Sequence, residues 1–113
     1  MNERTARVAV YNRSQGLCEV GVPGYCIGVG QSVHHRKNRS QGGTWDVVNL
    51  LHTCGDGVRH CHGWITAHPK AAHRAGWAVK SYEDPADHAV KMHGRFVLLT
   101  ADGRYEDLPE EAD

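Results

Sequence analysis

Val33-His34-His35-Arg36 is the first of three short motifs that predict the fold. The other two are Asn49-Leu50-Leu51 and Cys61-His62. Asn49 lies fourteen residues after His35, and His62 lies thirteen residues after Asn49. These separations are long enough for a strand, a loop, a returning strand and the first turns of a helix. Such a unit can bring two adjacent imidazoles, an amide and a third imidazole around one ion. We therefore expect a strand, strand, helix core.

The sequence around this core predicts short elements separated by glycine and proline. Gly42-Gly43 indicates a flexible polar loop over 36–45, Asp56 is a candidate N-cap, and Pro69 suits the first turn of a second helix. The expected helices are 3–13, 58–67 and 69–75, and the expected strands are 27–35, 47–52, 77–81 and 95–100, with a hairpin turn at 101–104.

Charge is distributed unevenly along the 113 residues, although the formal net charge is zero. Residues 1–82 carry ten Lys and Arg against four Asp and Glu (+6), whereas residues 83–113 carry three against nine (−6). The first part is positive, as a phosphate-binding surface should be, and the acidic end would be repelled by a polyanion. Glu106–Asp113 is expected to form a solvated tail.

Four cysteines, Cys18, Cys26, Cys54 and Cys61, lie in two loop-flanked pairs. They can form one closed tetrahedral zinc site, which would help to stabilise a chain with a small core. Disulfides in three pairings and four unrelated reduced thiols are the alternatives. The first residues, MNERTARVAV, lack the apolar stretch of a secretory signal, and no membrane span is visible, so we expect a reducing cytoplasm.

Adjacent residues in these motifs must have different roles. In a helix, Cys61 and His62 diverge by about 100°, so one can face the zinc and the other the strands. In a strand, His34 and His35 point to opposite faces unless the strand is distorted or ends there. We expect one of these imidazoles to bind a metal ion and the other to act on a water molecule.

Taken in order, the cysteines, Val33-His34-His35-Arg36, Gly42-Gly43, Asn49-Leu50-Leu51 and Cys61-His62-Gly63-Trp64 resemble the HNH endonucleases of the His-Me finger group, especially the small bacteriophage forms. The resemblance implies an α+β fold with a small ββα-metal core, flanking short helices and a C-terminal β-hairpin. It also implies an HNH domain with a zinc site over 1–82, with the close match at about 12–69. Residues 83–113 would be a C-terminal extension with the hairpin and the acidic tail.

The resemblance assigns roles residue by residue. His35 would be the general base, His34 and His62 would bind the catalytic ion, and Asn49 would brace the loop that aims His35. Arg36, Lys37 and Arg39, on the loop after the base, are candidates for phosphate contacts. The ligands of the structural zinc would be Cys18, Cys26, Cys54 and Cys61.

Thr66 departs from one common family pattern, in which a further histidine follows the last motif histidine by four residues. His68 does not replace it, because it lies about 240° round the helix and precedes a proline. Two protein ligands with water and phosphate oxygens favour Mg²⁺ or Mn²⁺ as the catalytic ion, with Ni²⁺ or Zn²⁺ as alternatives.

The expected activity is metal-dependent hydrolysis of DNA phosphodiester bonds, as weakly selective nicking, because no separate recognition helix is identified. The expected partners are double-stranded DNA and, by resemblance alone, the phage terminase large subunit in genome packaging, within the host cytoplasm. The alternative is a non-catalytic zinc-bound DNA- or protein-binding module with a degenerate HNH site. A redox protein is disfavoured, because the cysteines lack the two-residue spacing of a dithiol motif.

Overall fold

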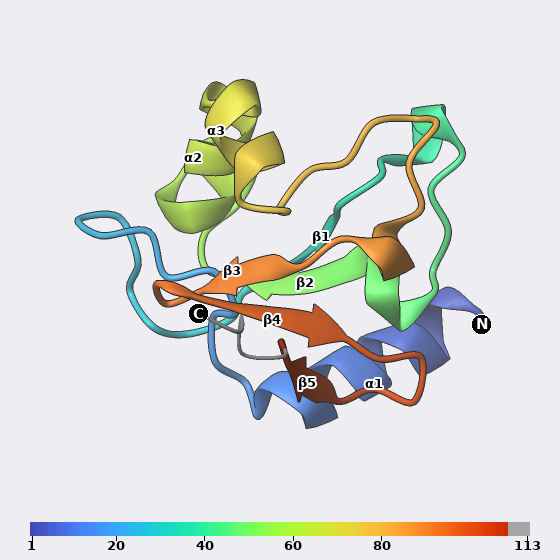
Figure 1. Cartoon of the computed structure of the whole chain (residues 1–113). Coiled ribbons are helices and arrows are strands. Elements are labelled where there is room, and N and C mark those ends of the chain that lie inside the picture. Colours follow the sequence, from blue (N-terminus) through green and yellow to red (C-terminus); the bar gives the residue numbers. More distant parts are fainter. Residues whose placement is uncertain (109–113) are drawn as a thin grey trace, which may run out of the picture.

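The computed structural model describes residues 1–108, and within this range the chain has a mixed α+β fold with two small antiparallel sheets (Figure 1). This confirms the predicted class. The acidic tail expected at the end of the chain lies partly outside the described residues. Its first two residues, Glu106 and Asp107, belong to a strand over Tyr105–Asp107.

Helix α1 (Glu3–Ser14) begins after Asn2, whose side-chain oxygen accepts a hydrogen bond from the backbone N–H of Thr5 at 2.9 Å. This is the usual way to satisfy a free donor at a helix start. Ala6 and Val10 are buried in a small cluster that also includes residues just before and within β2. The helix therefore packs against the central hairpin, on the side opposite α2 and α3 (Figure 1).

The central hairpin pairs β1 (Ser32–His35) with β2 (Leu50–Thr53) in antiparallel register, which places His34 opposite Leu51. The two strands are shorter than the predicted 27–35 and 47–52. Gly28 at φ +85° turns the chain within the first range, and a 3₁₀ turn (Val47–Asn49) occupies the start of the second. A second 3₁₀ turn, Arg39–Gln41, lies in the long connecting loop.

Helices α2 (His60–Ala67) and α3 (Pro69–Arg74) follow the hairpin and pack on each other. Pro69 occupies the first turn of α3, as predicted. Asp56 is not the N-cap of α2. Its carboxylate accepts a hydrogen bond from the N–H of Val58 at 3.0 Å in the preceding turn, and the helix begins four residues later.

The second sheet has the order β3 (Val90–Met92), β4 (Arg95–Leu99), β5 (Tyr105–Asp107). The predicted hairpin is formed by β4 and β5, and β3 adds a third strand before it. A 3₁₀ turn precedes the sheet at Pro85–Asp87. The predicted strand at 77–81 is wrong: among residues 1–108 the segment pairs with no strand, and its Val79 N–H donates to the Arg36 carbonyl at 2.9 Å.

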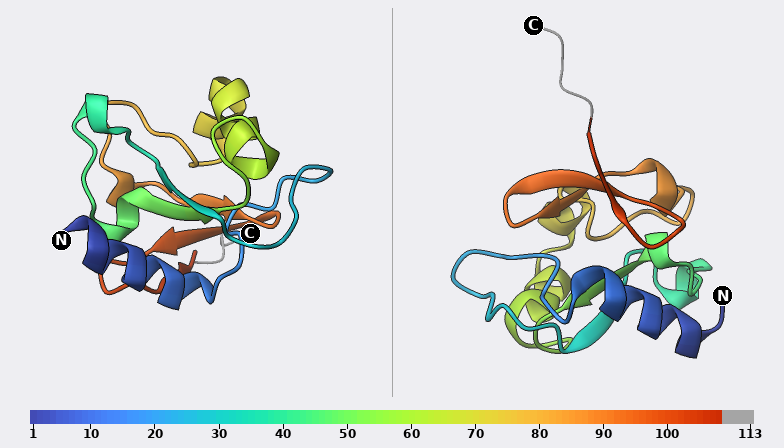
Figure 2. Two further views of the ribbon diagram at one scale, coloured as in Figure 1. Left: turned by 180° about the vertical axis from the view of Figure 1, so that it is seen from behind. Right: turned by 90° about the horizontal axis from the view of Figure 1, so that it is seen from below.

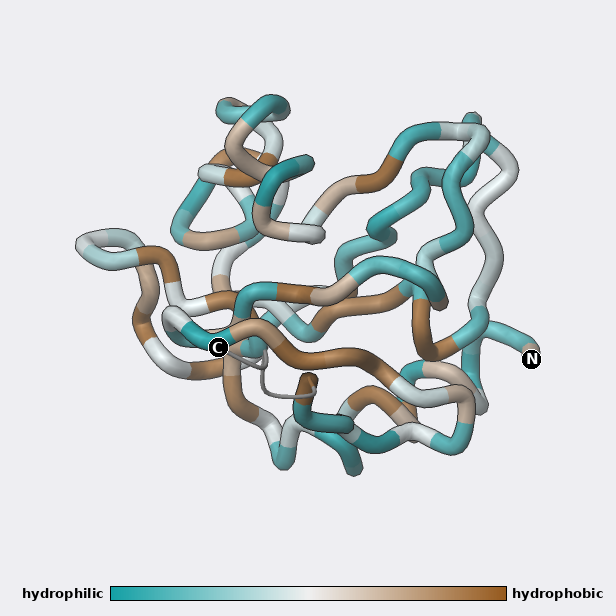
Figure 3. The backbone as a smooth tube through the Cα atoms, viewed as in Figure 1, coloured by the Kyte–Doolittle hydropathy of each residue, from teal (hydrophilic) through white to brown (hydrophobic). Residues whose placement is uncertain are grey.

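The larger hydrophobic cluster joins the cysteine region to the C-terminal sheet, because it contains cysteines and residues of β2, α2, α3, β3 and β4. The right-hand view of Figure 2 shows the C-terminal sheet as a layer to one side of the hairpin and α1. In Figure 3, β4 is hydrophobic, whereas the segment after β1 is hydrophilic. Within the described residues, none of the helices has the length and apolar character needed to cross a membrane.

Candidate metal centre and active site

Four cysteine side chains converge between the loop after α1, the end of β2 and the start of α2. The sulfur atoms of Cys18, Cys26, Cys54 and Cys61 all lie within 4.8 Å of one another. Cys26 is partly exposed, the other three are buried, and none forms a disulfide. Among residues 1–108 this is the one group of three or more such side chains placed to hold a metal ion. The cluster can therefore hold a tetrahedral ion such as zinc.

Backbone N–H groups point at these sulfur atoms. Val22 donates to Cys61 Sγ and Gly28 donates to Cys26 Sγ, each at 3.3 Å, and Cys61 N–H donates to Cys54 Sγ at 3.4 Å. Burial opposes ionisation of Cys54, but hydrogen bonds from Ile27 and Cys61 outweigh it and lower its pKa. Burial raises the pKa of Cys18 and of Cys61. A bound cation would be needed to keep all four as thiolates.

His34 of β1 and His62 of α2 meet beside the hairpin, with ring centroids 5.1 Å apart and planes at 70°. His34 Nε2 lies 2.7 Å from the carbonyl oxygen of Trp77, which can only accept, so Nε2 carries the proton. Burial lowers the pKa of His34 to about 4, and the ring is therefore neutral at physiological pH. Its Nδ1 is left with a free lone pair.

His62 contacts the protein through Nδ1, whereas His34 does so through Nε2. Nδ1 of His62 lies 2.8 Å from Ser32 Oγ on β1, and its backbone N–H donates to the Cys54 carbonyl at 3.1 Å. Burial lowers the pKa of this ring as well. The two histidines thus use opposite nitrogens for protein contacts, and each ring has one other nitrogen that could bind a metal ion.

His35 ends β1 and packs on Trp45, on the other side of the strand from His34. Its ring is edge-on to Trp45 with centroids 4.5 Å apart, and its Nε2 is buried with no hydrogen-bond partner among residues 1–108. Burial lowers the pKa of His35, and the guanidinium groups of Arg39 and Arg7 lower it further. The structure does not bring His35 into one ligand cluster with His34 and His62, but all three line one hollow of about 590 Å³.

Asn49 closes the loop that follows His35. Its Oδ1 accepts from the Lys37 N–H at 2.7 Å, and its Nδ2 donates to the carbonyls of Lys37 and Thr44, both at 3.0 Å. Gly43 lies so close to this turn that an added Cβ would be 1.7 Å from the Lys37 carbonyl oxygen. The amide is buried and uses both its donor and its acceptor groups to fix this loop.

Arg36 differs from the expectation that it contacts phosphate. It is 1% exposed, and its guanidinium donates to four carbonyls at 2.7–2.9 Å. The acceptors belong to Gly76, Val48, Pro85 and His88. With these donors occupied, Arg36 ties the loop to the C-terminal half. Lys37 and Arg39 remain nearer the surface, and Arg39 lines the hollow together with Lys80 and His73.

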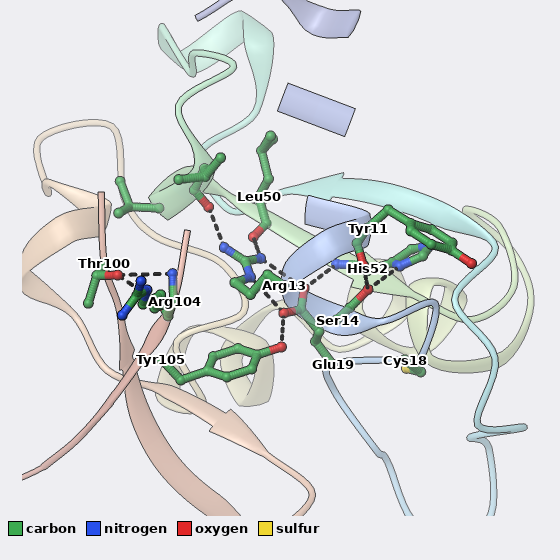
Figure 4. Close-up of polar contacts among 12 residues, drawn as sticks. Tyr11, Arg13, Ser14, Cys18, Glu19, Leu50, His52, Thr100, Arg104 and Tyr105 are labelled. Carbon is green, nitrogen blue, oxygen red and sulfur yellow. Dashed lines mark hydrogen bonds and ion pairs between the residues drawn. The ribbon is translucent and has the colours of Figure 1, made fainter. Parts of the chain in front are cut away.

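A buried polar cluster behind β2 was not anticipated from the sequence (Figure 4). Arg13 and Glu19 form a two-bonded ion pair, both bonds at 2.8 Å, with side chains 0% and 1% exposed. Tyr105 of β5 donates its hydroxyl to Glu19. Ser14 Oγ lies 2.7 Å from His52 Nδ1. The sequence does not indicate that Arg13 and Glu19 are buried, because most charged side chains are exposed to solvent.

Comparison with protein-family models, with curated proteins and with solved structures finds no match for the chain.

Proposed function

We propose that the chain is a metal-dependent HNH-type endonuclease that hydrolyses DNA phosphodiester bonds, with a ββα-metal core formed by β1, β2 and α2. The observation that carries this proposal is the contact between His34 and His62. Two neutral rings approach to 5.1 Å, each with one nitrogen held by a contact with the protein and the other without a hydrogen bond from the described residues. Such second contacts are typical of histidines that bind metal.

His34 and His62 would hold the catalytic ion, and Mg²⁺ or Mn²⁺ suits a site with two protein ligands and open positions. When bound, a divalent ion supplies positive charge at the scissile phosphate and at the leaving oxygen. Thr66 supplies no imidazole to this site, and its hydroxyl donates to the His62 carbonyl at 3.2 Å on its own helix.

His35 would be the general base that accepts a proton from the attacking water. Its Nε2 is buried without a partner, and the described hydrogen bonds leave Nδ1 free as well, so Nδ1 is the nitrogen available to water. Burial and the two nearby arginines keep the ring neutral, which is the form that can accept a proton. Asn49 supports this role by fixing the loop that begins at Arg36, directly after His35.

Lys80 and Arg39 would contact phosphate across the hollow, since both line it and carry positive charge. Lys37 belongs to the same loop, whereas Arg36 is excluded by its four carbonyl contacts. The partner is then double-stranded DNA. The phage terminase large subunit in the host cytoplasm is a further proposed partner, tested by co-purification of the two proteins during infection.

A binding module without activity is the second candidate, and the observation in its favour is Thr66 in place of a third histidine. Supercoiled-plasmid relaxation separates the two candidates, with Mg²⁺, Mn²⁺, Ni²⁺ or Zn²⁺ added in turn. The nuclease proposal predicts metal-dependent nicking that is lost in His34→Ala and His62→Ala and kept in His68→Ala, an exposed histidine outside the hollow. Folded, zinc-loaded wild type that binds DNA without cutting it supports the module.

A further inference from the structure

Ser32 lies at the junction of three polar groups between β1, β2 and α2. Its Oγ is 2.8 Å from the Gly55 carbonyl oxygen, 2.8 Å from His62 Nδ1 and 3.1 Å from Thr53 Oγ1. The hydroxyl has one proton to donate and two lone pairs to accept. Which neighbour receives that proton decides where the proton of the His62 ring lies.

The Gly55 carbonyl settles the direction of these bonds, because a carbonyl oxygen can only accept. Ser32 therefore donates to Gly55 at 2.8 Å, and the contact with His62 must be donated by Nδ1–H. The Thr53 hydroxyl has its own acceptor in the Ser32 carbonyl at 3.2 Å. A neutral imidazole carries one N–H, so Nε2 of His62 is left as the lone-pair nitrogen.

We propose that Ser32 is a positioning residue that keeps the ring proton of His62 on Nδ1 and thereby presents Nε2 for metal binding. The ion is the one that His34 and His62 would share, so the inference extends the proposed function. His34 provides the parallel case, since the Trp77 carbonyl keeps its proton on Nε2. Both rings are then set in the binding tautomer before any ion arrives.

The position of Gly55 connects the contact between Ser32 and His62 to the cysteine cluster. Gly55 directly follows Cys54, whose carbonyl accepts the His62 backbone N–H at 3.1 Å. The loop that carries a cysteine of the cluster thus fixes both the backbone and, through Ser32, the side chain of His62. One short segment sets the position of the ring and the location of its proton.

The test is the tautomer of His62, read by long-range proton–nitrogen NMR on zinc-loaded, nitrogen-15-labelled protein without a second metal. We expect Nδ1–H in the wild type and in Ser32→Thr, which keeps the hydroxyl. In Ser32→Ala we expect a shift toward Nε2–H, because nothing then holds the proton on Nδ1. Ser81→Ala, an exposed serine elsewhere, should match the wild type. Nε2–H in the wild type, or an unchanged tautomer in folded Ser32→Ala, would overturn the inference.

Mn²⁺ titration of the same proteins gives the second measurement. Losing the contact that orients a ligand commonly costs about 10–100-fold in metal affinity, so Ser32→Ala should bind Mn²⁺ more weakly by that factor, while Ser32→Thr should stay near the wild type. Equal Mn²⁺ affinity in Ser32→Ala and wild type would overturn the role of Ser32. If tautomer and affinity behave as expected but the wild type does not cut DNA, the nuclease proposal fails and the positioning role stands.

Discussion

The backbone N–H of His62 donates to the carbonyl of Cys54 at 3.1 Å, so the helix that carries a candidate catalytic ligand is anchored to a residue of the four-cysteine cluster. Cys61, the residue before His62, belongs to the same cluster. A structural ion bound there would hold one end of α2 in place. The two candidate metal sites use different side chains, but the Cys54–His62 hydrogen bond and the Cys61–His62 peptide bond connect them directly.

Zinc should be integral to the fold. We expect about one zinc per chain to survive dialysis, because four thiolates form a closed tetrahedral site. Cys54→Ser should lose this zinc and unfold at a lower temperature, since in such sites metal binding is part of the folding free energy. Elemental analysis and thermal melting measure both effects, with Ser81→Ala as the control. Fully folded, active protein without zinc would contradict the assignment.

Asn49 should matter for stability as well as for activity. Asn49→Ala removes three hydrogen bonds and leaves the Lys37 N–H without its acceptor, which should cost about 1–3 kcal/mol of unfolding free energy. Urea denaturation measures this cost. Asn12→Ala, at an exposed position on α1, is the matched control and should change stability little. Equal urea midpoints for Asn49→Ala and Asn12→Ala would show that the stability of the fold does not depend on the Asn49 hydrogen bonds.

The buried ion pair of Arg13 with Glu19 should be far more sensitive than a surface pair. Glu19→Gln leaves the Arg13 charge without its partner, and breaking a buried pair in this way commonly costs about 3–5 kcal/mol. Glu3→Gln breaks the exposed pair with Arg7, which is worth about 0.3–0.5 kcal/mol. Denaturant unfolding of the two variants gives the comparison, and similar losses would contradict the importance of burial.

Glu83 should contribute to acid sensitivity. The Lys80 N–H and then the His73 side chain lower the pKa of Glu83 below its ordinary value of 4.5. A carboxyl with a lowered folded-state pKa stabilises the fold above the unfolded value, and this contribution is lost as pH falls from 4.5 through the folded value. The free energy of unfolding of Glu83→Gln should therefore fall less steeply than that of the wild type over this range. Parallel profiles of unfolding free energy against pH for Glu83→Gln and the wild type would show that Glu83 does not cause the loss of stability in acid.

The sequence predicted the parts of the site that depend on local spacing. Strands at His34 and Leu51 and a helix at His62 follow from periodicity and turn residues, and the cysteine cluster follows from two loop-flanked pairs. The convergence of the four sulfur atoms agrees with that prediction. The segment at 77–81 was wrongly predicted as a strand, because it bends at Trp77 and Ala78, whose N–H groups donate back to the Ala72 carbonyl, and its Val79 N–H donates to the Arg36 carbonyl.

Long-range contacts explain what the sequence did not predict. Arg36 lies in a polar, charged stretch and looks solvated, yet its four acceptors come from residues 12 to 52 positions away. The pairing of Tyr105 with Glu19 spans 86 positions. Strand β3 was missed because it is three residues long and includes an exposed lysine. Local patterns carry no information on such partners.

The central claim is most directly tested by single-turnover nicking of supercoiled DNA, comparing zinc-loaded wild type with His35→Ala at saturating Mg²⁺ or Mn²⁺. Removal of a general base commonly costs about 10²–10⁴ in rate, so the variant should keep Mn²⁺ and DNA binding and lose cutting by that factor. Equal nicking rates for the two proteins, or no metal-dependent nicking by folded wild type, would contradict the account.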